Sequence, residues 1–137
     1  MHELSMASNI LEAVLEVASR YGAKKVLEVN IDVGELTLLN PDQLMVAFSV
    51  LSKGTIVEGA KLNINTVKAM ARCNRCGEEW ESNVYSKALY IDHLIVATNL
   101  DHNLRAFFKE TCPKCGESDF EFIAGNEFLI SRIKIEK

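Results

Sequence analysis

Several features that mark common protein classes are missing from this chain of 137 residues. No apolar run is long enough to predict a transmembrane helix, and the opening MHELSMASNI lacks the basic and apolar stretches of a secretory signal. No basic stripe is visible, and the formal net charge of −4 argues against nucleic-acid binding. We therefore expect a cytoplasmic protein that binds neither membranes nor nucleic acid.

Signatures of common enzymes are missing as well. The phosphate-binding pattern GxxxxGK[ST] does not occur, so any nucleotide hydrolysis must come from a partner protein. No set of Ser, His and Asp residues indicates nucleophilic catalysis, and no open metal site supports a metal-dependent hydrolase. We predict that the chain is not an enzyme.

The composition, with 48% hydrophobic and 25% charged residues, suits one compact domain or one domain with a small appendage. Apolar residues at three- and four-residue spacing predict a helix over residues 4–21, and strict alternation predicts a strand over residues 25–33. Asn40 as N-cap and Pro41 at the first helical position predict a second helix that ends near Ser52.

Two more strands are expected, over residues 60–71 and 127–136. The alternation of the first slips near Thr66, which indicates either a bulge or a strand that leaves one sheet for another. In the second, Leu129 and Ile133 are expected on the same face. We expect this last strand to return to the N-terminal sheet, since two long strands alone make a weak sheet. The segment between would then be an insertion.

The four cysteines form two CxxCG knuckles, Cys73 with Cys76 and Cys112 with Cys115. Two residues between ligands let both sulfurs face one point, and the following glycine permits the positive φ that turns the chain under a metal. In a reducing compartment such cysteines are better read as metal ligands than as disulfides. Four thiolates and no fifth ligand predict a closed, structural zinc site.

Cations close to the knuckles would offset the negative charge of four zinc-bound thiolates. They are Arg72, Arg75, Lys109 and Lys114. Three other interpretations stay open: free structural cysteines, a redox pair, and an iron site of the rubredoxin kind.

The N-terminal Met1-His2-Glu3 carries a second signal. The α-amine of Met1, the backbone nitrogen of His2 and the His2 imidazole can close fused rings around one metal ion. Such donors favour square-planar Ni(II) or Cu(II), which can displace an amide proton. The fourth position could be filled by the Glu3 amide, another side chain or water. The competing interpretation is a frayed, solvated N-terminus.

Together these features resemble one family. Besides MHELSMA and the two knuckles, the segments that carry the resemblance are VLEVNIDVGEL (residues 26–36), Phe48, Gly54-Thr55-Ile56, Glu58-Gly59-Ala60 and Ile133-Lys134-Ile135-Glu136. The chain is similar to the HypA family, the nickel-insertion accessory proteins of [NiFe]-hydrogenase maturation. The resemblance covers nearly the whole chain.

The resemblance implies an α+β fold, with two helices on a small three-stranded sheet and an inserted four-cysteine zinc-ribbon domain. The nickel-binding domain would comprise residues 1–70 and 124–137, and the zinc-binding domain residues 71–123. His2 would be the essential nickel ligand, with Met1 supplying its amine and Glu3 shaping the site. Zinc would be structural and nickel the transported ion. The implied partners are HypB, which hydrolyses nucleotide, and the hydrogenase large subunit; the sequence leaves open a homodimer.

The segment between the knuckles, residues 84–108, is long, as in archaeal members of the family. A histidine from such a segment can complete the nickel site in those members. His102 is the preferred candidate and His93 the alternative, while a surface or packing histidine is the competing interpretation of either.

A second function stays open beside the nickel metallochaperone. A zinc ribbon alone fits a protein- or nucleic-acid-binding module, although the negative net charge argues against nucleic acid.

Overall fold

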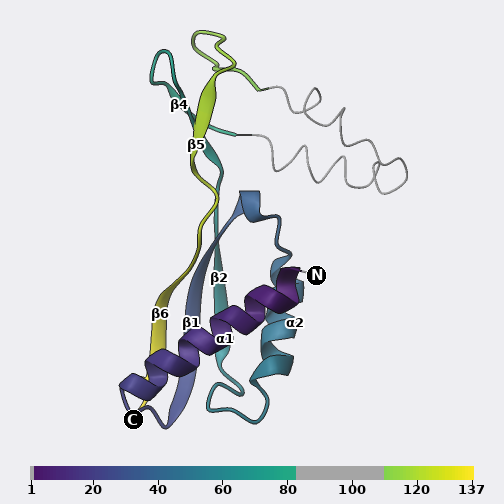
Figure 1. Cartoon of the computed structure of the whole chain (residues 1–137), viewed down its shortest axis with the longest axis vertical. Coiled ribbons are helices and arrows are strands. Elements are labelled where there is room, and N and C mark those ends of the chain that lie inside the picture. The colour runs from purple at the N-terminus through teal and green to yellow at the C-terminus, as the bar shows by residue number, and fades with distance from the viewer. Residues whose placement is uncertain (1, 83–109) are drawn as a thin grey trace, which may run out of the picture. The chain divides into compact units, whose positions relative to one another are not determined.

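The computed structural model describes residues 2–82 and 110–137 (Figure 1). The chain forms two compact units. The first comprises Met1–Val33, Leu39–Thr66 and Phe128–Lys137, and the second comprises Gly34–Leu38 and Val67–Glu127. No helix in the described residues is long and apolar enough to cross a membrane.

The first unit is built on a three-stranded sheet in the order β2-β1-β6. β1 (Lys25–Gly34) is central, and β6 (Phe128–Glu136) runs antiparallel beside it. β2 (Lys61–Val67) forms the other edge. The C-terminal strand therefore returns to the N-terminal sheet, as the sequence predicts.

Two helices complete the core of this unit, α1 (His2–Arg20) and α2 (Pro41–Ser52). α1 crosses the sheet in Figure 1, and its buried residues belong to the same hydrophobic cluster as those of α2 and β1. The largest fully buried side chains of this cluster are Val14, Val26, Val29, Ile31, Leu44 and Val57, and the larger Phe48 is almost fully buried beside them. Three- to four-residue spacing places the buried residues of each helix on one face, and in β1 the unpaired Leu27 lets Val26 share the buried face of Val29 and Ile31.

The start of α2 is set by two neighbouring residues, Asn40 and Pro41. Asn40 precedes the helix in an extended conformation, and its side-chain Oδ1 accepts the backbone N–H of Gln43 at 3.1 Å. Pro41 occupies the first helical turn, where no N–H is needed. The predicted N-cap is confirmed.

The pattern of β6 differs from the expectation in one place. Ile130 lies opposite Ile31 and Arg132 lies opposite Asn30, so Ser131 is an extra residue that forms a β-bulge. The bulge changes which face the preceding residues occupy. Ile130 packs against the core with Ile133, whereas Leu129 is 47% exposed. Placing Leu129 on the face of Ile133 was therefore wrong, because unbroken alternation does not survive an inserted residue.

The second unit holds a smaller sheet in the order β4-β3-β5. Its strands are β3 (Met70–Cys73), β4 (Glu79–Glu81) and β5 (Phe120–Ala124). The segment predicted as one strand over residues 60–71 thus contributes to both sheets, as β2 and β3, which explains the slip near Thr66. Trp80 of β4 packs edge-on against Phe120 of β5, with ring centroids 5.4 Å apart.

A short 3-10 helix, Glu35–Thr37, also belongs to this second unit. Glu35 Oε2 accepts the backbone N–H of Ala69 at 3.0 Å. Glu35 therefore anchors the chain just before β3. Over residues 2–82 and 110–137 the fold is α+β, with two α-helices and two small three-stranded sheets.

Candidate metal centre

The sulfur atoms of Cys73, Cys76, Cys112 and Cys115 lie within 4.8 Å of one another. The closest pairs join the two knuckles: Cys73 to Cys115 and Cys76 to Cys112, each with Sγ atoms 3.6 Å apart. A tetrahedral zinc ion with Zn–S bonds of about 2.3 Å requires sulfurs about 3.8 Å apart. The donor set and its spacing therefore fit a tetrahedral zinc ion.

Both knuckles fold in the same way. Gly77 N–H donates to the Cys73 carbonyl at 3.1 Å, and Gly116 N–H donates to the Cys112 carbonyl at 2.9 Å. Both glycines have positive φ, at 79° and 78°. Glycine adopts this conformation without the steric penalty of a Cβ atom, so the CxxCG spacing turns each chain under its sulfurs.

The first cysteine of each knuckle accepts hydrogen bonds from the backbone. Cys73 Sγ lies 3.4 Å from the N of Cys76 and 3.3 Å from the N of Arg75. The Cys76 N–H is the main reason that the pKa of Cys73 is lowered, to about 7, despite burial. Burial raises the pKa of Cys112, but the N–H groups of Cys115 and Lys114 outweigh it and lower that pKa overall.

The second cysteine of each knuckle behaves in the opposite way. The backbone N–H of Glu117 lowers the pKa of Cys115, but burial and hydrogen bonds with the other three thiols raise it to about 12. The pKa of Cys76 is likewise raised, although the backbone N–H of Glu78 acts against the shift. Two thiols are thus disposed to ionise and two to keep their protons. A metal ion that takes all four sulfurs must displace protons from Cys76 and Cys115.

One contact links the first knuckle to the segment that follows the second, and the sequence does not predict it. The Asn74 side-chain amide donates to Asp119 Oδ1 at 2.9 Å, and the Asn74 backbone N–H donates to the Asp119 carbonyl at 3.1 Å. Asn74 sits inside the first knuckle, and Asp119 follows the second. The pair fixes one knuckle against the other. No sequence signal could reveal it, because exposed Asn and Asp residues far apart in a chain are common.

The cations near the knuckles have mixed roles. Arg72 forms an ion pair with Glu79 at 3.4 Å. This carboxylate partly neutralises the charge that Arg72 would otherwise offer to the sulfurs. Arg75 and Lys114 contribute backbone N–H groups to the sulfurs. Lys109 lies outside the described residues.

The nickel residues predicted from the sequence are described only in part. His2 is the first residue of α1, and Glu3 follows in the first helical turn. Met1, His93 and His102 lie outside the described residues. An acidic residue in the first turn of a helix is stabilised by the unpaired N–H groups there.

The fold and the cysteine cluster define a class: a two-unit α+β protein with a four-thiolate metal site. The family model described as "Hydrogenase/urease nickel incorporation, metallochaperone, hypA" matches residues 1–135. The chain belongs to the HypA family of nickel metallochaperones for hydrogenase maturation, and the resemblance stated from its motifs is confirmed.

Similar proteins agree with this assignment. The hydrogenase maturation factor HypA of Methanothermobacter thermautotrophicus is 40% identical over 137 residues, which cover 100% of this chain and 98% of that protein. HypA of Methanopyrus kandleri is 39% identical over 136 residues, covering 99% and 94%.

Two solved structures share the fold. The solution structure of the Ni metallochaperone HypA from Helicobacter pylori gives a TM-score of 0.59 at 21% identity, covering 98% of this chain and 97% of that one. A further HypA solution structure gives a TM-score of 0.63 at 21% identity, covering 98% and 96%.

Proposed function

We propose that this protein binds Ni(II) at its N-terminus and delivers it to the large subunit of a [NiFe]-hydrogenase during maturation. The observation that carries the proposal is the family match, which begins at residue 1 and so includes Met1, His2 and Glu3. The donors are the Met1 α-amine, the His2 backbone nitrogen and the His2 imidazole, with Glu3 shaping the site. His102 completes the site, and His93 is its alternative.

The position of His2 at the start of α1 suits this chemistry. The first N–H groups of a helix have no intrahelical acceptor, so deprotonating the His2 amide breaks no helical hydrogen bond. The same helix end carries partial positive charge, which opposes a nearby cation by about 0.3–1 kcal/mol. This opposition weakens nickel binding about two- to fivefold, which favours release without preventing binding.

Zinc has a different role in the proposal. Cys73, Cys76, Cys112 and Cys115 would hold it in a closed site with no position for substrate, so it stabilises the fold rather than catalysing a reaction. The protein is then a carrier and not an enzyme. In this proposal residues 1–70 with 124–137 are the nickel domain, and residues 71–123 are the zinc domain.

The proposed partners follow from the family. HypB would supply nucleotide hydrolysis, and the hydrogenase large subunit would receive the metal. All three proteins would act in the cytoplasm, and a homodimer is compatible with the proposal.

The test is a Ni(II) titration of the zinc-loaded protein, followed by calorimetry and visible absorption. Three forms are compared: the native N-terminus, His2→Gln, and a form with one extra residue before Met1. We expect only the native form to bind one nickel ion with a square-planar spectrum. Equal binding by all three forms, or binding by none, would contradict the terminal chelate.

The same titration assigns the remaining ligand. His102→Gln and His93→Gln are matched variants in the same segment. We expect His102→Gln to weaken nickel binding and His93→Gln to leave it unchanged. The reverse result would assign the role to His93.

A further inference from the structure

The C-terminal strand β6 has an open edge. Among the described residues, β1 is the only strand paired with it. The Glu136 carbonyl accepts the Lys24 N–H, so the main chain of Glu136 faces the sheet. In an antiparallel strand, the N–H and C=O groups of one residue point to one edge and those of the next residue to the other edge. The main-chain groups of Ile133 and Ile135 therefore point to the open edge. This edge could bond to a further strand.

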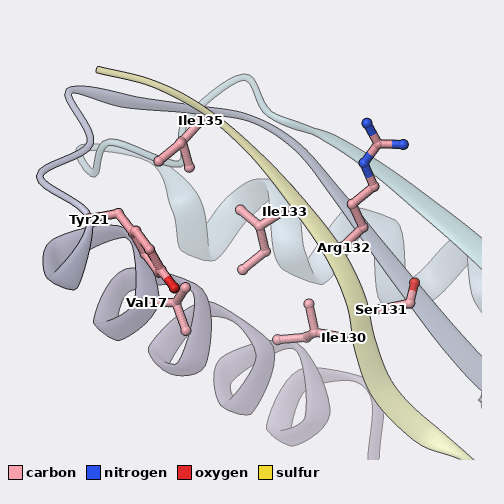
Figure 2. A pocket seen from close by; sticks show the side chains of 7 residues that line it. All are labelled: Val17, Tyr21, Ile130, Ser131, Arg132, Ile133 and Ile135. Atoms are coloured by element: carbon pink, nitrogen blue, oxygen red, sulfur yellow. The ribbon is translucent and has the colours of Figure 1, made fainter.

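An apolar groove of about 480 Å³ lies next to this edge, between β6 and the C-terminal half of α1 (Figure 2). Val17 and Tyr21 line it from the helix side, and Ile130, Ile133 and Ile135 line it from the strand, where Ser131 and Arg132 also border it. Figure 2 shows the isoleucine side chains on the side of β6 that faces α1. Tyr21 is 61% exposed, although its ring borders the isoleucine side chains of the groove. The groove therefore offers binding energy to apolar side chains from outside the unit.

The opposite face of β6 carries two cations, followed by Glu136 at the end of the strand. Arg132 points away from α1 in Figure 2, and Lys134 shares its face by alternation. Neither forms an ion pair with another described residue. Lys134 lies opposite Glu28 on β1, whereas Arg132 lies opposite uncharged Asn30. Arg132 is therefore the cation that gains most from an acidic neighbour at the open edge.

The charges also argue against a second copy of this chain as the occupant. Two β6 strands paired antiparallel about Ile133 would set Arg132 of one copy against Lys134 of the other. Like charges directly opposite each other destabilise a strand pair, and cations on an edge strand discourage self-pairing. The same cations would favour a strand that carries carboxylates.

We propose that an extended segment of a partner protein adds to β6 as a further strand, with apolar and acidic side chains in alternation. Its apolar residues enter the groove between β6 and α1, and its acidic residues lie beside Arg132 and Lys134. The bulge at Ser131 ends the regular edge, so the paired stretch is Arg132–Glu136. Strand addition of this kind takes its affinity from main-chain hydrogen bonds and its specificity from alternate side chains. None of the residues that line this groove is a proposed nickel ligand.

The probe is a synthetic peptide of alternating valine and glutamate, acetylated and amidated. One matched peptide has lysine in place of glutamate, and another keeps the glutamates but carries N-methyl groups on the residues that would donate to β6. Binding to the zinc-loaded full chain is followed by amide NMR shifts and amide exchange. We expect the glutamate peptide to shift and protect the amides of Ile133 and Ile135. The lysine and N-methyl peptides should bind at least about tenfold more weakly.

Two charge variants decide the specificity. Arg132→Glu should reverse the preference in favour of the lysine peptide. Lys61→Glu makes the same change in charge on β2, the opposite edge strand, and should leave the preference unaltered. Thermal melts check that both variants fold.

Three results would overturn the proposal: amide shifts that map away from β6, equal binding of the N-methyl peptide, or an unchanged preference in Arg132→Glu. Sedimentation that shows a dimer which the glutamate peptide cannot dissociate would assign the edge to a second copy instead. His2→Gln should bind the peptide normally, so this result is independent of the nickel test.

Discussion

Gly34 and Gly125 bring their backbones so close together that a Cβ atom at position 34 would overlap the Gly125 carbonyl. That carbonyl accepts the Leu36 N–H at 2.8 Å, and Gly34 N–H donates to the Glu127 carbonyl at 2.7 Å. The φ of Gly34 is −75°, a value that any residue can adopt. Glycine is required here by the close approach and not by the backbone conformation.

Gly34→Ala should therefore lower the free energy of unfolding by about 3 kcal/mol, the upper end for over-packing, because a backbone carbonyl cannot rotate out of the way. Urea unfolding followed by far-UV circular dichroism, which reports on both units, would measure it. Gly22→Ala is the control, since Gly22 has φ +64° and open space around it. That control should cost about 1–2 kcal/mol from φ strain alone. An equal or smaller loss in Gly34→Ala would contradict the steric argument.

Asn40→Ala should destabilise α2 by about 1 kcal/mol, because the Gln43 N–H loses its side-chain acceptor. Asn40→Asp keeps an acceptor oxygen and should retain most of the stability. Amide exchange across Pro41–Ser52 would compare the two variants. Equal exchange in both would show that the cap contributes nothing measurable.

Removing metal from the cysteine site with a strong chelator should loosen the second unit first. The amides of Gly77 and Gly116 belong to the knuckles, which have little buried apolar surface besides the metal site. The first unit has its own core, in which Val29 and Ile31 of β1 are fully buried. We expect amide exchange to speed up in the knuckles while β1 stays protected. Uniform loss of protection across both units would contradict this prediction.

Zinc binding should release protons in a number that depends on pH. At pH 7 the thiols of Cys76 and Cys115 keep their protons, since their pKa values are raised, and Cys73 is about half ionised at its pKa of about 7. With Cys112 contributing up to one more, we expect about three protons per zinc ion.

The lowered pKa of Cys73 sets the direction of the pH effect. Cys73 is mostly a thiolate above pH 7 and gains a proton as the pH falls through 7. Zinc affinity should therefore drop between pH 8 and pH 6. Over the same range, the number of protons released per zinc ion should rise by about one. Calorimetry in buffers of different ionisation enthalpy measures both quantities. A proton count that stays constant over this range would show that Cys73 is not the thiol that ionises first.

Local patterns in the sequence were enough to predict much of this molecule. The start of α2 follows from Asn40 and Pro41, which act on the backbone within one helical turn. The cysteine knuckles follow from CxxCG, because ligand spacing and a following glycine operate over only five residues. The family followed from the motifs at both ends of the chain.

Other features depend on residues far apart in the chain. The bulge at Ser131 exists because β6 must register against β1, and it decided that Ile130 rather than Leu129 faces the core. The contact of Asn74 with Asp119 needs both knuckles to be in place.

The sequence by itself determined the helices, the two longest strands, the four-sulfur donor set and the family, since each of these depends on spacing between residues close together in the chain, whereas it did not predict β4 and β5. Only the tertiary structure decided where Gly34 meets Gly125, and that β6 ends its sheet with an open edge beside a groove. These properties arise from distances between segments that the chain order does not specify, and they depend on packing and on strand register.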